Sequence, residues 1–257
     1  MASEILAEKV CLITGGAGGL GKAIAREFLQ SGAKVVVSDI NEIFLKTATD
    51  ELSPLGSFLA LKGDVTSEES AMLLFQEIIK TYGQLDVLVN NAGIMDQFGP
   101  VGEVDKTLWD KVIQVNLTGP FIMTKLAVLH FLERKGKGVV LNIGSLASIK
   151  GGVSGAAYTA SKHGLLGLTK STAVMYGKND IRCNILMPGS MATNISTAFA
   201  SGISQVGEAL LRKGMAAVEP PIVPLDQVGK TAAFVCSDGA GFLNGAQISV
   251  DGGWNAY

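Results

Sequence analysis

The chain has 257 residues, of which 47% are hydrophobic and 17% are charged, and a formal net charge of −2 at pH 7. This length and composition suit one large α/β domain or two small ones. The slightly acidic balance and the lack of a basic block disfavour nucleic acid and anionic membranes as partners. Cys11, Cys183 and Cys236 are widely spaced within apolar segments, which predicts buried free thiols and no metal site.

The sequence carries no targeting signal that we can identify. The first residues include Glu4 and lack an apolar run, so a secretory signal is not expected. The most apolar long stretch, 120–132, is too short to cross a membrane and contains Lys125. We therefore expect a cytoplasmic protein.

A glycine-rich turn follows the first predicted strand. Residues 10–14 form an apolar run, Gly15-Gly16-Ala17-Gly18-Gly19-Leu20-Gly21 comes next, and a helical pattern covers 22–30. Two glycine spacings fit, one at positions 16, 18 and 21 and the other at positions 15, 19 and 21. In this strand–turn–helix context the glycines let backbone N–H groups approach a pyrophosphate, which predicts a dinucleotide site rather than a merely tight turn.

The second predicted strand, 34–39, ends in an acid. Asp39 lies 18 residues after Gly21, where a carboxylate accepts hydrogen bonds from an adenosine ribose and repels a 2′-phosphate. Ile40 and Asn41 beside it offer no arginine to receive that phosphate. The sequence therefore favours NAD over NADP. The alternative role for Asp39 is a helix N-cap, which Asn41 can equally provide.

Strand and helix patterns alternate along the rest of the chain. Further strands are predicted at 58–61, 85–89, 139–143, 181–186 and 246–250, and helices at 67–82, 105–132, 155–176 and 226–237. Asp64 follows the third strand, at the strand end where open parallel sheets bind ligands. The fold class is α/β, with about seven strands in a doubly wound parallel sheet and helices on both faces, and residues 1–257 are expected to form one domain.

One long segment shows neither the helical nor the strand period of hydrophobic residues. Residues 190–224 follow a strand and contain Pro220, Pro221 and Pro224. Such a segment is either a lid over a ligand or a poorly ordered loop. Its apolar side chains favour a lid; they are Ile195, Phe199, Leu210, Leu211 and Met215.

Tyr158 and Lys162 are four residues apart in a predicted helix, so they lie on one face about 5–6 Å apart at Cβ. A free tyrosine has a pKa of about 10, and bringing it to about 7 takes roughly 4 kcal/mol in favour of the phenolate. A fixed ammonium supplies part of that, more so with a second positive charge such as an oxidised nicotinamide. Ser145, at the preceding strand end, would hold the substrate oxygen. The pair alone is more typical of an ordinary amphipathic helix.

Asn116 interrupts the apolar side of the 105–132 helix. On local evidence a polar amide there is more often a satisfied core residue or a surface position than a catalytic one.

These motifs together resemble the short-chain dehydrogenase/reductase family over essentially the whole chain. The matching motifs are Thr14-Gly15-x-x-x-Gly19-x-Gly21, Asp64, Asn90-Asn91-Ala92-Gly93, Asn116, Ser145, Tyr158-x-x-x-Lys162 and Pro188-Gly189 with Thr193. The full set, in order and with family-like spacing, is highly specific. The resemblance implies a Rossmann-type fold and hydride transfer between a nicotinamide cofactor and an alcohol or ketone.

The resemblance also implies residue roles. Tyr158 would be the acid/base, Ser145 would bond the substrate oxygen, and Lys162 would lower the pKa of the tyrosine and hold the nicotinamide ribose. Asn116 would support a water that links Lys162 to solvent. The implied cofactor contacts are Gly15, Gly19, Leu20, Gly21, Asp39, Asp64, Val65, Asn91, Gly93, Tyr158, Lys162, Met191 and Thr193.

Two positions differ from the commonest family pattern. Gly144 precedes Ser145 where the family more often has serine, and Gly16 stands where phosphate-preferring members often carry a basic residue. The second difference agrees with NAD. Family members are commonly tetramers built through the two long helices, here 105–132 and 155–176, so the resemblance implies a homotetramer or homodimer, with a second interface around Trp254.

The expected function is NAD(H)-dependent oxidoreduction of a secondary alcohol or ketone. The alternatives are an NADPH-dependent ketoreductase of the 3-oxoacyl type and a redox-silent member of the same fold. The expected pocket residues are largely apolar, which favours an apolar or cyclic substrate, although Arg212 and Lys213 could reach an anionic group. They are Ile94, Met95, Leu146, Ala147, Gly152, Val153 and the 190–224 segment.

Overall fold

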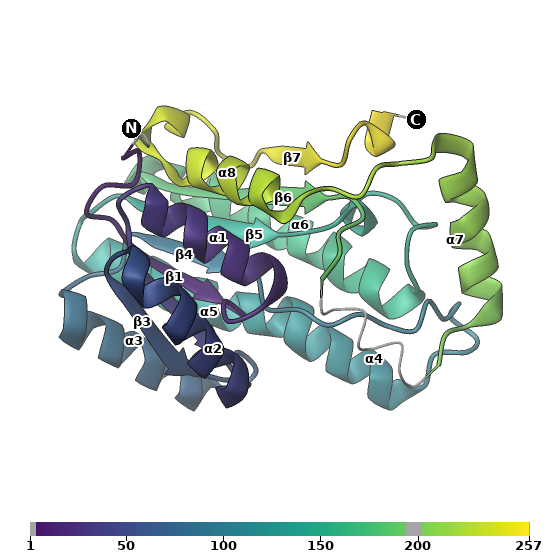
Figure 1. The fold of residues 1–257 in the computed structure, drawn as a ribbon, viewed down its shortest axis with the longest axis horizontal. Coiled ribbons are helices and arrows are strands. Elements are labelled where there is room, and N and C mark those ends of the chain that lie inside the picture. The colour runs from purple at the N-terminus through teal and green to yellow at the C-terminus, as the bar shows by residue number, and fades with distance from the viewer. Residues whose placement is uncertain (1–3, 194–201, 257) are drawn as a thin grey trace.

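The computed structural model describes residues 4–193 and 202–256, and its framework is a seven-stranded parallel sheet in the order β3-β2-β1-β4-β5-β6-β7 (Figure 1). The strands are β1 (Val10–Thr14), β2 (Lys34–Asp39), β3 (Phe58–Lys62), β4 (Val87–Asn90), β5 (Gly138–Ile143), β6 (Ile181–Pro188) and β7 (Gln247–Val250). The strand order reverses between β1 and β4, which is the point where such sheets bind ligands.

Helices cover both faces of this sheet (Figure 1). They are α1 (Gly19–Gln30), α2 (Glu42–Leu52), α3 (Glu68–Tyr82), α4 (Lys106–Ile113), α5 (Gly119–Glu133), α6 (Ala156–Tyr176), α7 (Gln205–Val218) and α8 (Leu225–Cys236). Helices α1, α2 and α8 bury side chains in one core cluster, and α3, α5 and the end of α6 contribute to the other. The predicted doubly wound parallel sheet is confirmed.

The inner strands β1, β2, β4, β5 and β6 are rich in apolar residues because both of their faces are buried, whereas the edge strands β3 and β7 are only partly buried. Cys11 and Ile13 of β1 enter one core cluster, while Val10 and Leu12 enter the other. Successive strand residues point to opposite faces, so a two-sided core removes the usual alternation of apolar and polar residues. Each fully buried aliphatic side chain contributes about 1.5–3 kcal/mol to folding.

Helix starts follow local capping chemistry. The Asn41 side chain accepts hydrogen bonds from Ile43 N and Phe44 N and so caps α2, which leaves Asp39 for another role. Ser67 caps α3, as its position before the helical pattern predicts. Such a cap stabilises a helix by about 1 kcal/mol.

Two expected segments differ in the structure. The helix predicted over 105–132 contains a π-helical turn, Gln114–Thr118, between α4 and α5. The 190–224 segment was expected to be irregular, and this was wrong for α7, which Ser204 caps by accepting from Gly207 N. Residues 194–201, which include Ile195 and Phe199, lie outside the described residues. Helix α2 is not among the helices whose ranges the sequence predicts, although a helix N-cap was considered at Asp39 and Asn41.

The three cysteines are free and buried, as predicted. Burial raises the pKa of the Cys183 and Cys236 thiols to about 12, and it also raises that of Cys11. Within the described ranges no cluster of three His, Cys, Asp or Glu side chains could hold a metal ion. One helical stretch, Lys106–Glu133, is long and apolar enough to cross a membrane by length and composition, and half of its most apolar window is buried inside the protein.

His130 on α5 predicts a pH-dependent stability. Its Nε2 accepts a hydrogen bond from Leu85 N at 3.1 Å, which requires a neutral ring nitrogen. Burial, and then the charge of Arg134, lower the pKa of His130 in the folded protein. Since the unfolded chain has a histidine pKa of about 6.5, it binds protons first, and the free energy of unfolding falls as pH drops below about 6.5.

Replacing this side chain by one that cannot be protonated should weaken that dependence. We expect urea denaturation of His130→Gln to vary less with pH between about 7 and 5 than that of wild type. His163→Gln, at an exposed position on α6, is the matched control and should follow wild type. Equal pH dependence in the two variants would contradict this role of His130.

Candidate active site

The expected site residues gather where the parallel strands end. Gly15 follows β1, Asp39 ends β2, Asn91 follows β4 and Ser145 follows β5. Because β1, β2, β4 and β5 are parallel, their carboxyl ends meet at one edge of the sheet. The candidate site therefore lies at the carboxyl ends of these strands, beside the β1–β4 pair where the strand order reverses.

The glycine turn is built so tightly that side chains are excluded. Gly15 and Gly19 have φ angles of +60° and +48°, in the left-handed region that glycine adopts without strain. A Cβ at Gly21 would overlap the carbonyl oxygen of Gly15 and lie 2.5 Å from Asn91 Nδ2. A Cβ at Gly16 would likewise lie 2.7 Å from Val37 Cβ, so close packing requires glycine in both registers, while the positive φ angles fall at positions 15 and 19 of the second.

Asn91 joins the glycine turn to β4. Its Nδ2 donates to the carbonyl oxygens of Thr14 and Gly15, both at 2.9 Å. The Thr14 hydroxyl in turn accepts from the backbone N–H groups of Asn91 and Ala92, both at 3.1 Å. Asn91, an expected cofactor contact, thus also fixes the turn that would hold a pyrophosphate.

Asp39 lies beside the same turn. Its Oδ1 accepts from Asn41 N at 3.0 Å, and its Oδ2 accepts from Ala17 N at 3.4 Å. Each carboxylate oxygen keeps capacity for a second bond, such as one from a ribose hydroxyl. Lys62, in register with Asp39 on β3, is ion-paired with Glu42.

These groups fit a dinucleotide. Among the described residues no side chain caps the N-terminus of α1, where Gly18 is the N-cap, and the first turn of α1 holds no acid. Backbone N–H groups and the helix dipole are therefore directed at the place where a pyrophosphate would lie. Leu20, in that first turn, is buried and packs into the core.

The other expected cofactor contacts are placed as follows. Asp64 Oδ1 accepts from Thr66 N at 2.8 Å and from the Thr66 hydroxyl at 2.7 Å, so it first shapes its own turn. Val65 packs against Gly119, where a Cβ would lie only 2.9 Å from its side chain. Met191 packs against the core below β6. Thr193, the last residue described before 202, follows it.

Tyr158 lies near the N-terminus of α6 with only 7% of its surface exposed. Burial raises the pKa of its hydroxyl to about 12, a hydrogen bond with the Ser145 side chain lowers it, and the charge of Asp96 raises it. The hydroxyl is therefore neutral in the protein alone. The structure brings Ser145 and Tyr158 together, as the sequence predicts.

Lys162 is held beside Tyr158 by a hydrogen bond to the backbone of β5. Its Nζ donates to Ile143 O at 2.8 Å, lies 5.4 Å from the centroid of the Tyr158 ring, and has its pKa lowered to about 8 by burial. Burial penalises the charged forms of both residues. The lowering of the tyrosine pKa by Lys162 stays a prediction.

Asn116 lies in the π-helical turn and is completely buried. Its Oδ1 accepts from Ile94 N at 2.8 Å, and its Nδ2 donates to Ile94 O at 2.9 Å and to the Ser161 hydroxyl at 3.2 Å. It is therefore a satisfied core residue, as local reasoning favours. A Cβ at Gly93 would lie 3.4 Å from Asn116 Oδ1 and 3.7 Å from Lys162 Nζ, so both side chains border Gly93.

Gly144 departs from the commonest family residue for a packing reason. A Cβ at this position would lie 2.7 Å from Ile185 Cδ1 and 2.8 Å from the Ser148 hydroxyl. The bulk of Ile185 thus makes glycine the fitting residue before Ser145.

Asp96 is a site residue that the sequence reasoning missed. It is completely buried, between β4 and α4, and accepts a hydrogen bond from Tyr158 N at 2.9 Å. An acid within the largely apolar segment 94–101 could have indicated a buried carboxylate. Its partner Tyr158, however, lies 62 residues away in the chain.

Apolar side chains surround the tyrosine. Val112, Ala147 and Ala157 form a buried cluster with Tyr158. Partly buried residues packed against it are Ile94, Met95, Val104, Leu108, Trp109 and Val153. Four of the expected pocket residues therefore gather here, while Leu146 and Gly152 lie outside this cluster.

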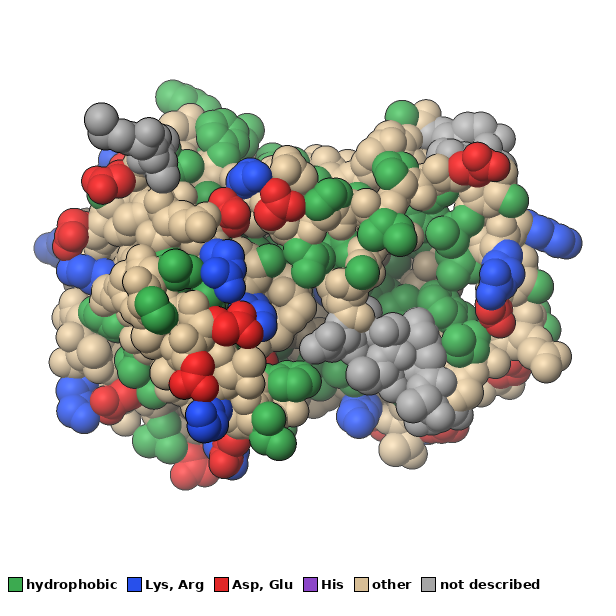
Figure 2. Space-filling model, viewed as in Figure 1, with side chains coloured by type: hydrophobic (Ala, Val, Ile, Leu, Met, Phe, Trp, Pro, Cys, Tyr) green, Lys and Arg blue, Asp and Glu red, His purple; other side chains and the backbone are tan. Residues whose placement is uncertain are grey.

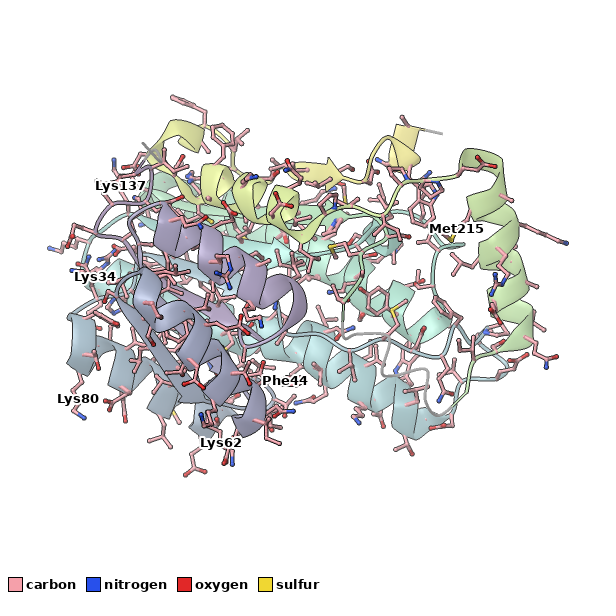
Figure 3. The ribbon with its side chains drawn as sticks, viewed as in Figure 1. Lys34, Phe44, Lys62, Lys80, Lys137 and Met215 are labelled. Atoms are coloured by element: carbon pink, nitrogen blue, oxygen red, sulfur yellow. The ribbon has the colours of Figure 1, made fainter. Side chains whose placement is uncertain are left out.

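Helix α7 stands apart from the sheet and borders a hollow with hydrophobic walls (Figures 1 and 2). Met215 lies on the side of α7 that faces the rest of the protein (Figure 3). A hollow of about 410 Å³ is lined by Arg212, Met215, Ala216, Glu219 and Pro220, and another of about 330 Å³ by Val101, Val104, Lys106, Trp109 and Ala156. Arg212 is ion-paired with Glu208.

Comparison with known proteins gives consistent matches along the chain. Residues 15–255 match the family model adh_short_C2, described as Enoyl-(Acyl carrier protein) reductase. The chain is 44% identical to the short chain dehydrogenase/reductase dpchG of Colletotrichum higginsianum, over 98% of this chain and 95% of that protein. It is 40% identical to 3beta-hydroxysteroid dehydrogenase 2 of Eggerthella lenta, over 99% and 98% respectively.

A solved structure shares the fold closely. The 3-ketoacyl-(acyl-carrier-protein) reductase from Brucella melitensis, complexed with NADH, matches with a TM-score of 0.85 and 28% identity, over 97% of this chain and 99% of that one.

The glycine turn yields a prediction. Gly21→Ala should force the turn apart, because its Cβ would overlap the Gly15 carbonyl oxygen. Such overpacking costs about 1–3 kcal/mol, so we expect a lower melting temperature and at least about tenfold weaker NADH binding, followed by fluorescence. Gly102→Ala, where a Cβ meets nothing within 4 Å, is the control. Unchanged stability and NADH affinity in Gly21→Ala would contradict the role of this turn.

Proposed function

The chain belongs to the short-chain dehydrogenase/reductase family and is an NAD(P)-dependent oxidoreductase acting on CH–OH groups, and on this premise we propose that it transfers a hydride between NAD(H) and a secondary alcohol or its ketone. The observation that carries the proposal is that the Ser145 side chain approaches the Tyr158 hydroxyl and lowers its pKa, while Tyr158 lies in an apolar cluster with Lys162 Nζ 5.4 Å from the centroid of its ring. Such an assembly can hold and move one proton at the substrate oxygen.

Tyr158 acts at that oxygen in both directions. Ketone reduction needs a proton on the carbonyl oxygen, and the neutral Tyr158 hydroxyl donates it while Ser145 holds the oxygen in place. Alcohol oxidation needs the reverse, and the tyrosine oxygen then accepts the proton. When bound, the nicotinamide supplies or receives the hydride and, in its oxidised form, adds the positive charge that favours the phenolate.

Lys162 would pass the proton between Tyr158 and the groups beyond it. Burial holds the pKa of its ammonium at about 8, so the side chain can change protonation near neutral pH more readily than an exposed lysine. Its anchor on Ile143 O keeps Nζ under the ring while Asn116 borders the same glycine, Gly93. This arrangement supports a relay from Tyr158 through Lys162 toward Asn116.

NAD(H) is the proposed cofactor because Asp39 lies where an adenosine ribose would bind. Its carboxylate approaches the backbone of the glycine turn, and a 2′-phosphate placed there would be repelled. The Brucella melitensis reductase, solved with NADH, supports the same choice. The one opposing observation is Lys62 beside Asp39, which would have to leave Glu42 to reach a phosphate.

The proposed substrate is apolar or cyclic. Aliphatic and aromatic side chains dominate the surroundings of Tyr158, and burying a ring against them is favourable at roughly 25 cal/mol per Å². The Eggerthella lenta relative, named for a 3beta-hydroxysteroid, supports a secondary alcohol on a ring system. The 190–224 segment, through α7, would cover such a substrate.

An NADPH-dependent 3-oxoacyl reductase is the second candidate. The name of the Brucella melitensis neighbour favours a 3-oxoacyl substrate, and the position of Lys62 next to Asp39 favours NADPH. The redox-silent alternative is weaker because Asn116, Ser145, Tyr158 and Lys162 are all retained.

We also propose a homotetramer or homodimer. Large apolar side chains are exposed on α5, at Phe121 and Leu129, and on α6, at Val174 and Met175. Unpaired apolar surface on these two long helices is typical of subunit contacts.

The first experiment is a fluorescence titration with NADH and with NADPH, followed by oxidation of a panel of cyclic and acyclic secondary alcohols with NAD. Tight binding of NADH and turnover of a secondary alcohol are expected. Preference for NADPH would place the second candidate first, and binding of neither would favour a redox-silent protein.

Tyr158→Phe removes the proton carrier and leaves the ring in place. We expect turnover to fall by about 10²–10⁴-fold, with NADH affinity close to wild type. Tyr176→Phe, at the far end of the same helix, is the matched control and should keep wild-type turnover. Substantial activity in Tyr158→Phe would remove Tyr158 from the mechanism.

Asp39→Ala should reduce the preference for NADH. Loss of the carboxylate removes hydrogen bonds to the ribose and the repulsion of a 2′-phosphate, so the ratio of the two dissociation constants should shrink by about tenfold or more. Asp50→Ala, which removes an exposed acid of α2, is the control. An unchanged ratio would show that another group selects the cofactor.

A further inference from the structure

Asp96 is a completely buried carboxylate that accepts three hydrogen bonds from backbone N–H groups of the described residues. Its Oδ1 accepts from Phe98 N and Gly155 N, both at 3.1 Å, and its Oδ2 accepts from Tyr158 N at 2.9 Å. A buried carboxylate is costly unless hydrogen bonds compensate for its lost hydration. The three N–H groups and the positive end of the α6 dipole supply that compensation.

This arrangement caps α6 from another part of the chain. A helix is usually capped by the side chain of its own N-cap residue, but the N-cap of α6 is Gly155, which has none. Asp96, from the loop between β4 and α4, takes over that function. The start of α6 is therefore fixed relative to the same loop that carries Gly93 and Ile94.

The absence of a side chain at Gly155 leaves the space that the Asp96 carboxylate occupies. A Cβ at position 155 would lie 2.5 Å from Asp96 Oδ2 and 2.7 Å from its Oδ1. The Ala156 N–H also donates to Gly99 O at 2.9 Å, on the far side of the same loop. Loop and helix thus meet at consecutive residues, with the carboxylate enclosed between them.

We propose that Asp96 is a positioning residue for Tyr158, its carboxylate holding the tyrosine backbone and the first turn of α6 at a fixed place in the active site. This inference rests on the proposed acid/base role of Tyr158 for its catalytic consequence. The contact itself is independent of any substrate.

The charge of Asp96 has a second consequence for the tyrosine. Burial and then this carboxylate oppose ionisation of Tyr158, while Ser145 favours it, so the pKa of the hydroxyl is raised. Of the other charged or titratable groups on the packed elements, Lys162 on α6 has its Nζ 5.4 Å from the ring centroid. The remaining ones include His163 and Lys170 on α6, Lys106, Asp110 and Lys111 on α4, and Glu103 and Asp105 just before α4. Asp96 therefore favours the protonated tyrosine, the form that donates a proton to a ketone.

The test uses the whole protein without substrate. Tyrosines labelled with ¹³C at Cζ are titrated by NMR, with the Tyr158 signal assigned from Tyr158→Phe, and exchange of the Tyr158 amide is measured. Asp96→Asn keeps the side-chain shape, removes the charge and leaves one oxygen acceptor. We expect Tyr158 to titrate at lower pH than in wild type and its amide to exchange at least about tenfold faster.

Two further variants make the result decisive. Asp105→Asn, at the exposed N-cap of α4, removes a comparable capping acid and should change neither measurement. Gly155→Ala keeps the charge but displaces the carboxylate, so the Tyr158 amide should again exchange faster. If Asp96→Asn does not fold, Gly155→Ala decides.

Turnover then connects the contact to catalysis. With the best alcohol of the panel and NAD, Asp96→Asn should lower kcat by about tenfold and shift its pH profile to lower pH, with the KM for NAD unchanged. Wild-type titration and amide exchange in Asp96→Asn would overturn the proposal. Normal turnover in Tyr158→Phe would instead overturn the proposed function and leave the Asp96 contact as measured.

Discussion

The side chain of Asn91 makes the two hydrogen bonds on which the site depends most. By bonding the carbonyl oxygens of Thr14 and Gly15, it joins the end of β1 to the end of β4 where the strand order reverses. The two crossovers leave the sheet in opposite directions at that point. The Asn91 side chain holds the glycine turn on the β4 side, while Gly16 N donates to Ser38 O on the β2 side. The partly buried amide of Asn91 supplies that constraint by pairing with two carbonyl groups, and together with the Gly15 carbonyl oxygen it leaves no room for a side chain at position 21.

The segment after β4, residues 91–96, also contacts the residues of the acid/base site. Asn91 holds the glycine turn, Gly93 lies between Asn116 and Lys162, Ile94 bonds Asn116 through both backbone groups, and Asp96 bonds the backbone of Tyr158. Cofactor cradle and acid/base are therefore positioned by one short stretch of chain. A displacement of this stretch would move both together, so cofactor and tyrosine would keep their mutual distance.

Much of this architecture could be predicted because its determinants are local. Two-sided burial gives strands their apolar runs, and Ser67 marks a helix start by its own side-chain chemistry. The glycine turn could be identified because its glycines stand directly between a strand pattern and a helix pattern. Asp96 was missed because its partners on α6 are 59 and 62 residues away, and no local pattern reports such a contact. The raised pKa of Tyr158 was missed for the same reason, since burial depends on the finished core.

The π-helical turn at Gln114–Thr118 explains why Asn116 seemed out of place in an amphipathic helix. Such a turn holds one residue more than an α-helical turn, so the apolar stripes of α4 and α5 are out of phase by about 100°. In evolutionary terms it behaves as a one-residue insertion in a regular helix. Deleting a residue here would rotate all of α5 against the sheet, whereas substitutions on its exposed side would not. This stretch of chain should therefore be far less tolerant of changes in length than of changes in composition.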